Sequence, residues 1–234
     1  MEAPVERWAA IVVAAGTGTR FGAPKQFLEL AGLPMAGWSI RTFASMPEVT
    51  ALVVATEPAW IDRMNELCRR VAGGTGVVVV PGGATRQESV RNALARVPDS
   101  CDGTFVHDGA RPLIDARDVR AGMRAVGIGR AAVLAAPIVD TVKVVDRDGR
   151  IERTIDRANL RGAQTPQFAR TDDLRRAHAK ATGAREATDD AVLLEAIGID
   201  VYAIEPQGEN FKVTVPGDAR RAEAVLSQRA PACG

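Results

Sequence analysis

The chain has 234 residues, of which 46% are hydrophobic and 25% are charged, and this composition excludes an intrinsically disordered protein. Its 30 basic and 29 acidic residues leave a formal net charge of +1. The chain therefore lacks the overall positive field that captures nucleic acids, and we predict that it binds none.

Short apolar runs alternate along the chain with segments of helical periodicity, as in an α/β sandwich with a mostly parallel sheet. In chain order, the first half predicts strand 10–14, helix 35–46, strand 51–55, helix 58–71, strand 77–80, helix 85–97 and strand 104–106. The second half predicts strand 131–136, helices near 172–181 and 189–197, strand 201–204 and a helix near 218–228. No linker interrupts this order, so we predict one domain over residues 1–234.

Segment 138–156 breaks the alternation. Two apolar runs, 138–145 and 151–155, flank the turn sequence Asp-Arg-Asp-Gly at 146–149. A β-arm of this kind exposes two edges that need covering, so we predict that it mediates dimerisation. The alternative is a hairpin that folds back on its own sheet.

A glycine-rich loop follows the first strand, with glycines at 16, 18 and 22 and two cations, Arg20 and Lys25. It does not match the dinucleotide fingerprint, which needs a third glycine where Phe21 stands. It does not match a P-loop either, because its lysine follows Pro24. Backbone N–H groups beside two fixed cations suit a triphosphate; the alternative is a solvated loop with incidental charges.

A second cluster, His-Asp-Gly-Ala-Arg at 107–111, comes directly after the fourth strand. Asp108 is well placed there to hold Mg²⁺, which prefers one or two carboxylates together with phosphate oxygens. Arg111 is a candidate phosphate ligand, and we predict that His107 is a packed core histidine. Gly82 and Gly83, after the third strand, predict a second loop that approaches a ligand closely.

The three cysteines, Cys68, Cys101 and Cys233, are an odd set without metal-binding spacing. We therefore expect no disulfide framework and no zinc site, and a reducing cytoplasm as the location. The N-terminal apolar run, 9–15, is too short to span a membrane, and we expect neither a signal peptide nor membrane association.

Several motifs occur in one order between about residues 10 and 224, and together they are similar to those of the 2-C-methyl-D-erythritol 4-phosphate cytidylyltransferases of the non-mevalonate isoprenoid pathway. They are the glycine-rich loop, 82–89, 107–111, Asp140-Thr141, Asp156-Arg157, 165–167, Thr188-Asp189 and 211–214.

The resemblance implies a Rossmann-like nucleotidyltransferase fold, a homodimer built through the β-arm, and CTP, Mg²⁺ and a polyol phosphate as ligands. It implies that Arg20 and Lys25 stabilise the transition state and that Arg157 and Lys212 aim the nucleophile. It assigns CTP contacts to Ala14, Ala15, Gly16, Gly82, Ser89 and Asp108, with Asp108 also holding the metal. It assigns the methylerythritol phosphate to Arg111, Thr141, Arg157, Thr165, Thr188 and Lys212, several of them from the partner subunit.

The sequence departs from the family pattern twice. Val13 stands where the family often has proline, and the stretch between Arg20 and Lys25 is short; neither change removes a side chain with an assigned role. Because the sequence ends at Gly234, we expect no fused cyclase domain.

Two other functions stay open. One is a ribitol 5-phosphate cytidylyltransferase, which shares these loops and differs in the sugar-phosphate pocket. The other is a nucleotide-binding regulator without turnover, which the joint presence of Arg20, Lys25, Asp108, Arg157 and Lys212 disfavours.

Overall fold

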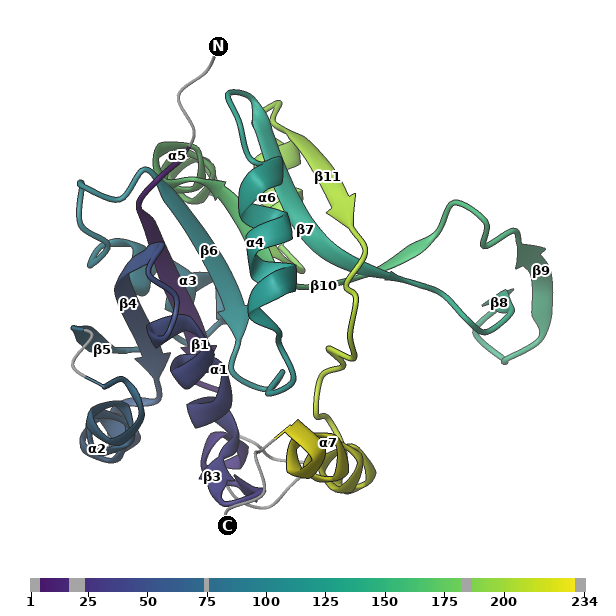
Figure 1. Cartoon of the computed structure of the whole chain (residues 1–234). Helices are drawn as coiled ribbons and strands as arrows, with labels where there is room; N and C mark the ends of the chain where they lie inside the picture. The colour runs from purple at the N-terminus through teal and green to yellow at the C-terminus, as the bar shows by residue number, and fades with distance from the viewer. Residues whose placement is uncertain (1–4, 17–23, 74–75, 182–186, 230–234) are drawn as a thin grey trace.

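A computed structural model describes residues 5–16, 24–73, 76–181 and 187–229. Its centre is a seven-stranded sheet in the order β11-β7-β10-β6-β1-β4-β5 (Figure 1). The strands are β1 (Trp8–Ala14), β4 (Val49–Thr56), β5 (Val77–Pro81), β6 (Gly103–Asp108), β7 (Arg130–Pro137), β10 (Arg161–Arg170) and β11 (Asp200–Ile204). Only β10 runs antiparallel to its neighbours, β6 and β7; the other pairs are parallel.

Helices cover both faces of the sheet, because successive strand residues point to opposite faces. In β1, Ala10 and Val12 pack into the core shared with α1 (Met35–Ala44), α2 (Ile61–Val71) and α4 (Ala116–Ala125). Ala9 and Ile11 pack into the core shared with α3 (Arg86–Leu94), α5 (Thr171–Lys180) and α6 (Asp190–Glu195). The α/β sandwich with a mostly parallel sheet is confirmed.

A third apolar cluster holds the segments that surround the carboxyl edge of the sheet. The small hairpin of β2 (Glu29–Leu30) and β3 (Leu33–Pro34) packs with the last helix, α7 (Pro216–Arg229). Trp38 of α1 joins them by donating a hydrogen bond from its indole nitrogen to the Leu30 carbonyl at 2.9 Å. The chain just after the glycine-rich loop is thereby fixed against the C-terminal helix.

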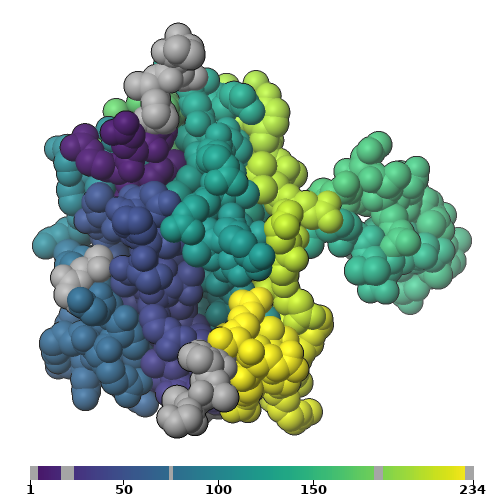
Figure 2. Space-filling view, in the orientation of Figure 1, coloured from purple at the N-terminus to yellow at the C-terminus, as the bar shows by residue number. Residues whose placement is uncertain are grey.

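The β-arm projects from the body. Its strands, β8 (Val142–Val145) and β9 (Ile151–Ile155), pair only with each other among the described strands. The arm leaves the main sheet where Pro137 pairs with Arg161, and it forms a separate lobe in the space-filling view (Figure 2). The hairpin is therefore not folded back on its own sheet, although its first strand starts at Val142 rather than at 138. The turn is as predicted, with Gly149 at a φ of 84°.

The sequence patterns missed helix α4 and strand β10, as well as the short β2–β3 hairpin and the 3-10 helix Lys25–Phe27. Helix α4 presents Gly122 to the sheet, where a Cβ atom would collide with the ring of Phe168. Its buried face holds Asp118, Val119, Gly122 and Met123, so only two bulky apolar residues mark the helix in the sequence. Strand β10 begins with polar and small residues, Arg-Gly-Ala-Gln-Thr, where the chain returns from the arm. Among the described residues, no helix is long and apolar enough to cross a bilayer.

Candidate functional site

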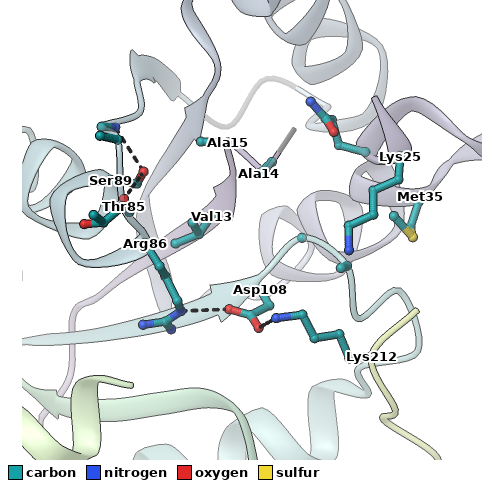
Figure 3. Close-up of a pocket in the computed structure, with 16 residues that line it drawn as sticks. Val13, Ala14, Ala15, Lys25, Met35, Thr85, Arg86, Ser89, Asp108 and Lys212 are labelled. Atoms are coloured by element: carbon teal, nitrogen blue, oxygen red, sulfur yellow. Dashed lines mark hydrogen bonds and ion pairs between the residues drawn. The ribbon is translucent and has the colours of Figure 1, made fainter. Parts of the chain in front are cut away.

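A cavity of about 300 Å³ opens where β1 and β6 end and α3 begins (Figure 3). This is the edge at which open α/β sheets bind their ligands, because the loops after parallel strands diverge there. The lining residues are Val13, Ala14, Ala15, Gly16, Lys25, Gln26, Met35, Gly83, Ala84, Thr85, Arg86, Ser89, Asp108, Gly109, Ala110 and Lys212.

One wall of the cavity is backbone, from the end of β1 and the start of α3. Thr85 caps α3 by accepting a hydrogen bond from the Glu88 N–H, as the capping-box sequence predicts. Ser89 accepts a hydrogen bond from the Gly83 N–H at 3.0 Å and donates one to the Thr85 carbonyl at 2.9 Å. These bonds hold the loop open toward the cavity.

The two glycines of this loop have different positions. Gly83 lines the cavity, whereas Gly82, to which the family resemblance assigns a nucleotide contact, is not part of the lining. A Cβ atom on Gly82 would collide with Ala15, and its N–H donates to the Thr56 carbonyl at 2.7 Å. Gly82 therefore brings the two walls together, and Gly83 faces the cavity.

Four alternating charges run from the protein interior to the cavity. Asp190 pairs with Arg86 at 2.9 Å, Arg86 with Asp108 at 3.1 Å, and Asp108 with Lys212 at 2.8 Å. Figure 3 shows Arg86 and Lys212 approaching Asp108 from opposite sides. Burial alone would raise the pKa of Asp108, but the attraction of Arg86 and Lys212 outweighs it and holds that pKa well below its usual range.

Arg86 is a site residue to which the sequence analysis gave no role. Its second carboxylate partner, Asp190, is only 1% exposed and also contacts His178 at 2.9 Å. The backbone N–H groups of Asp190 and Ala191 donate to the side-chain oxygen of Gln167, which fixes the start of α6. The only local signal for Arg86 was its place in the first turn of a capped helix after two glycines.

Lys25 lies on a one-turn 3-10 helix, Lys25–Phe27, that an aromatic cluster anchors. The Phe27 ring packs against Trp60 at a centroid distance of 5.9 Å. The guanidinium carbon of Arg63 lies 4.3 Å from the centroid of the Phe27 ring. The Lys25 ammonium donates to the Val213 carbonyl at 3.2 Å. Lys25 and Lys212 therefore lie on the same side of the cavity, opposite Arg86 (Figure 3).

Behind the cavity, His107 is fully buried, as predicted for a packed core histidine. Its ring nitrogens contact the Thr165 hydroxyl at 3.1 Å and the Arg111 carbonyl at 3.0 Å. Burial lowers the pKa of His107 to about 4, so the ring is neutral at physiological pH. Thr165 accepts a hydrogen bond from the Asp108 N–H, and Arg111 donates to the Asn210 carbonyl. Both side chains are buried in this network.

The remaining assigned residues are not part of this cavity within the chain. Thr141 and Arg157 lie exposed on the arm, where the Arg157 guanidinium donates to the Ile138 carbonyl at 2.8 Å. Thr188 is exposed, just before α6. Arg20 lies outside the described residues, as do Gly18, Gly22 and Cys233.

The lining offers one carboxylate to a metal ion, that of Asp108. Within the part of the chain that the structure describes, no three His, Cys, Asp or Glu side chains come together as a metal cluster. A single carboxylate fits Mg²⁺, which takes its other ligands from substrate phosphates and water. It does not fit a metal held by protein ligands alone.

The arrangement is suited to a polyanion. Backbone from the end of β1 and the start of α3 forms one wall of the cavity and two ammonium groups lie across from it, while the described lining contains neither histidine nor cysteine. Such a site positions and neutralises phosphates and does not supply a nucleophile of its own.

Comparison with known proteins identifies similar chains. The family model for 2-C-methyl-D-erythritol 4-phosphate cytidylyltransferase (IspD) matches residues 8–228. The cytidylyltransferase of that name from Endomicrobium trichonymphae is 40% identical over 220 residues, covering 93% of this chain and 98% of its own length. The one from Frankia casuarinae is 44% identical over 229 residues, covering 97% and 84%. The crystal structure of the Thermus thermophilus enzyme superposes with a TM-score of 0.72 at 32% identity and covers 97% of this chain and 99% of that one.

Proposed function

The chain belongs to the family of 2-C-methyl-D-erythritol 4-phosphate cytidylyltransferases, and from this premise we propose that it transfers the cytidylyl group of CTP to 2-C-methyl-D-erythritol 4-phosphate. The observation that supports this most directly is the cavity itself. It sets Lys25 and Lys212 against a glycine-lined wall, with Asp108 between Lys212 and Arg86.

The reaction needs positioned charge and no general base. A phosphate oxygen of methylerythritol phosphate, already ionised near neutral pH, bonds to the α-phosphorus of CTP while the bond to the bridging oxygen breaks and pyrophosphate leaves. No proton has to move, which agrees with a site whose nearest histidine, His107, is buried and neutral. Catalysis then rests on orientation and on stabilising the charge of the transition state.

We assign the nucleotide to the two backbone walls. Ala14, Ala15 and Gly16 on one side, and Gly83 and Ser89 on the other, leave space for a small pyrimidine, with Gly82 holding the walls together. Lys25, with Arg20 of the same loop, neutralises the triphosphate as the α-phosphorus becomes pentavalent. Asp108 would hold Mg²⁺, which when bound adds positive charge at the phosphates.

The acceptor phosphate is assigned to Lys212 together with residues from a partner subunit. Arg157 and Thr141 belong to the projecting arm, between Pro137 and Arg161, and are not among the residues that line the cavity of their own chain. An arm that crosses to a second subunit would bring them to its cavity, where Arg157 and Lys212 aim the nucleophile. Arg111, Thr165 and Thr188 are also assigned to methylerythritol phosphate. Arg111 and Thr165 would act through the buried hydrogen-bond network behind the cavity.

The single-domain organisation and the homodimer are part of this proposal, and the arm supplies a test. It exposes Val139, Val145 and Ile151, an apolar surface that a partner would cover. The protein should sediment as a dimer, and Ile151→Asp should dissociate it and abolish most of its activity. A parent protein that stays monomeric at all concentrations in analytical ultracentrifugation would remove the dimer and the shared site together.

The function itself is tested by measuring pyrophosphate release with Mg²⁺ and a panel of substrates. CTP with methylerythritol phosphate should react far faster than ATP or GTP with the same acceptor, because the space between the two walls suits a small ring. Faster reaction with ribitol 5-phosphate would favour the ribitol enzyme, and tight CTP binding without turnover would favour the regulator.

The buried free thiols of Cys68 and Cys101 suit the reducing cytoplasm that we propose as the location of this protein.

A further inference from the structure

Lys212 lies on a segment that belongs to no helix or strand. On its C-terminal side the backbone is held by the Val213 N–H, which donates to the Ala110 carbonyl at 2.8 Å, so the question is what holds the N-terminal side. Residues 209–214 run between β11 and α7 without secondary structure. The Lys212 side chain has several rotatable bonds and is 41% exposed. An ammonium that must meet one phosphate oxygen needs its backbone held accurately, because reaction rates depend steeply on small displacements.

Asn210 fixes this segment with both amide hydrogens. Its side-chain nitrogen donates to the Thr165 carbonyl at 2.7 Å and to the side-chain oxygen of Gln164 at 3.1 Å. Asn210 is 2% exposed, so water cannot replace these bonds. Its own carbonyl accepts a bond from the Arg111 guanidinium at 2.7 Å. One buried residue thus ties the segment both to β10 and to the loop after β6.

These contacts and the ion pair between Lys212 and Asp108 form a closed ring of interactions. The Asp108 N–H donates to the Thr165 hydroxyl, the Thr165 carbonyl accepts from Asn210, and two residues later Lys212 returns to the Asp108 carboxylate. Asn210 therefore fixes this segment on the N-terminal side of Lys212, as the bond from Val213 to Ala110 does on the C-terminal side, and together they set the separation between the backbones of Asp108 and Lys212.

We propose that Asn210 is a positioning residue for the transfer reaction, which acts by placing the Lys212 ammonium. The proposal rests on the proposed function, because Lys212 must matter to turnover for its placement to matter. Asn210 contacts neither substrate in this scheme. Alanine keeps the backbone carbonyl that accepts from Arg111, so the loss of the side chain should act mainly through Lys212 and largely disappear when Lys212 is absent. A general packing defect should act in any background.

The test is a double-mutant cycle. Asn210→Ala should lower kcat by about 10- to 10²-fold while the KM for CTP changes little. In the Lys212→Ala background, the same change should have almost no further effect on kcat, measured by transfer of radiolabelled CMP. Equal fold-losses in both backgrounds would show that Asn210 acts on stability alone. Near-parental kcat in Asn210→Ala would overturn the proposal outright.

Two further variants separate a loss of stability from a loss of positioning. Thr104→Val removes another buried hydrogen bond, that between Thr104 and Thr171 at 2.8 Å, and should lower the melting temperature without changing kcat. If Asn210→Ala does not fold, Gln164→Ala removes one of its two acceptors and should show a smaller kcat loss with the same dependence on Lys212. Absence of cytidylyl transfer by the parent would instead refute the proposed function.

Discussion

An Asp108→Asn variant is expected to lose about 10²- to 10³-fold in kcat while remaining folded. The amide keeps the volume of the carboxylate but removes the charge that Arg86 and Lys212 share at 3.1 Å and 2.8 Å. Lys212 then loses the ion pair that orients it, and Mg²⁺ loses the one carboxylate of the described cavity lining. Steady-state assays with CTP and methylerythritol phosphate measure the loss.

The pH dependence distinguishes this explanation from one that needs titration of the carboxyl. The pKa of Asp108 is held far below its usual range, so the parent enzyme carries the charge at every pH where it is assayed. The fold-loss of Asp108→Asn should therefore be constant from about pH 6 to 9. Asp99→Asn is the matched control, since Asp99 is exposed and pairs with Arg175 away from the cavity. An Asp108→Asn enzyme with near-parental kcat would remove Asp108 from the mechanism.

The fold was predictable wherever elements bury large apolar side chains in a regular pattern. Strands β1 and β4 are nearly continuous apolar runs because helices cover both of their faces, and β6 is buried along its whole length around the apolar residues Phe105 and Val106. Helix α4 and strand β10 were not predictable in this way. They contact each other through Gly122 and Phe168, and a glycine that admits an aromatic ring has no periodic signature. The antiparallel direction of β10 also depends on the path of the arm, which no local pattern records.

The site was predictable where its residues follow strands and where the family resemblance supplied the rest. Asp108 and the glycine-rich loop meet in one cavity because parallel strands end at the same edge. Arg86 was missed because its two partners, Asp108 and Asp190, lie far along the chain, and ion pairs of that range leave no local trace. Gly82 and Gly83 look alike in sequence, and neither has room for a side chain, because a Cβ atom would collide with Ala15 or with Glu88; only the structure shows that Gly83 lines the cavity and Gly82 does not.

Lys25→Ala is expected to reduce kcat by about 10²-fold or more while the KM for CTP changes little. The Lys25 ammonium lines the cavity opposite Arg86, on a 3-10 turn that Phe27 anchors. In the free protein it donates to the Val213 carbonyl at 3.2 Å, next to Lys212, so binding CTP exchanges one oxygen partner for another. The lost bond offsets part of the gain in the ground state. The gain becomes large only as negative charge grows on the oxygens around the pentavalent α-phosphorus.

Arg157→Ala is the contrasting variant in this last experiment. The Arg157 guanidinium lies on the arm, where it contacts the Ile138 carbonyl. Its proposed role is to orient the acceptor phosphate, so its removal should raise the KM for methylerythritol phosphate along with any loss in kcat. Steady-state kinetics with each substrate varied separately resolve the two patterns. If Lys25→Ala instead kept a near-normal kcat and bound CTP more weakly, Lys25 would be a binding residue. Stabilisation of the transition state would then have to come from Arg20 and the metal.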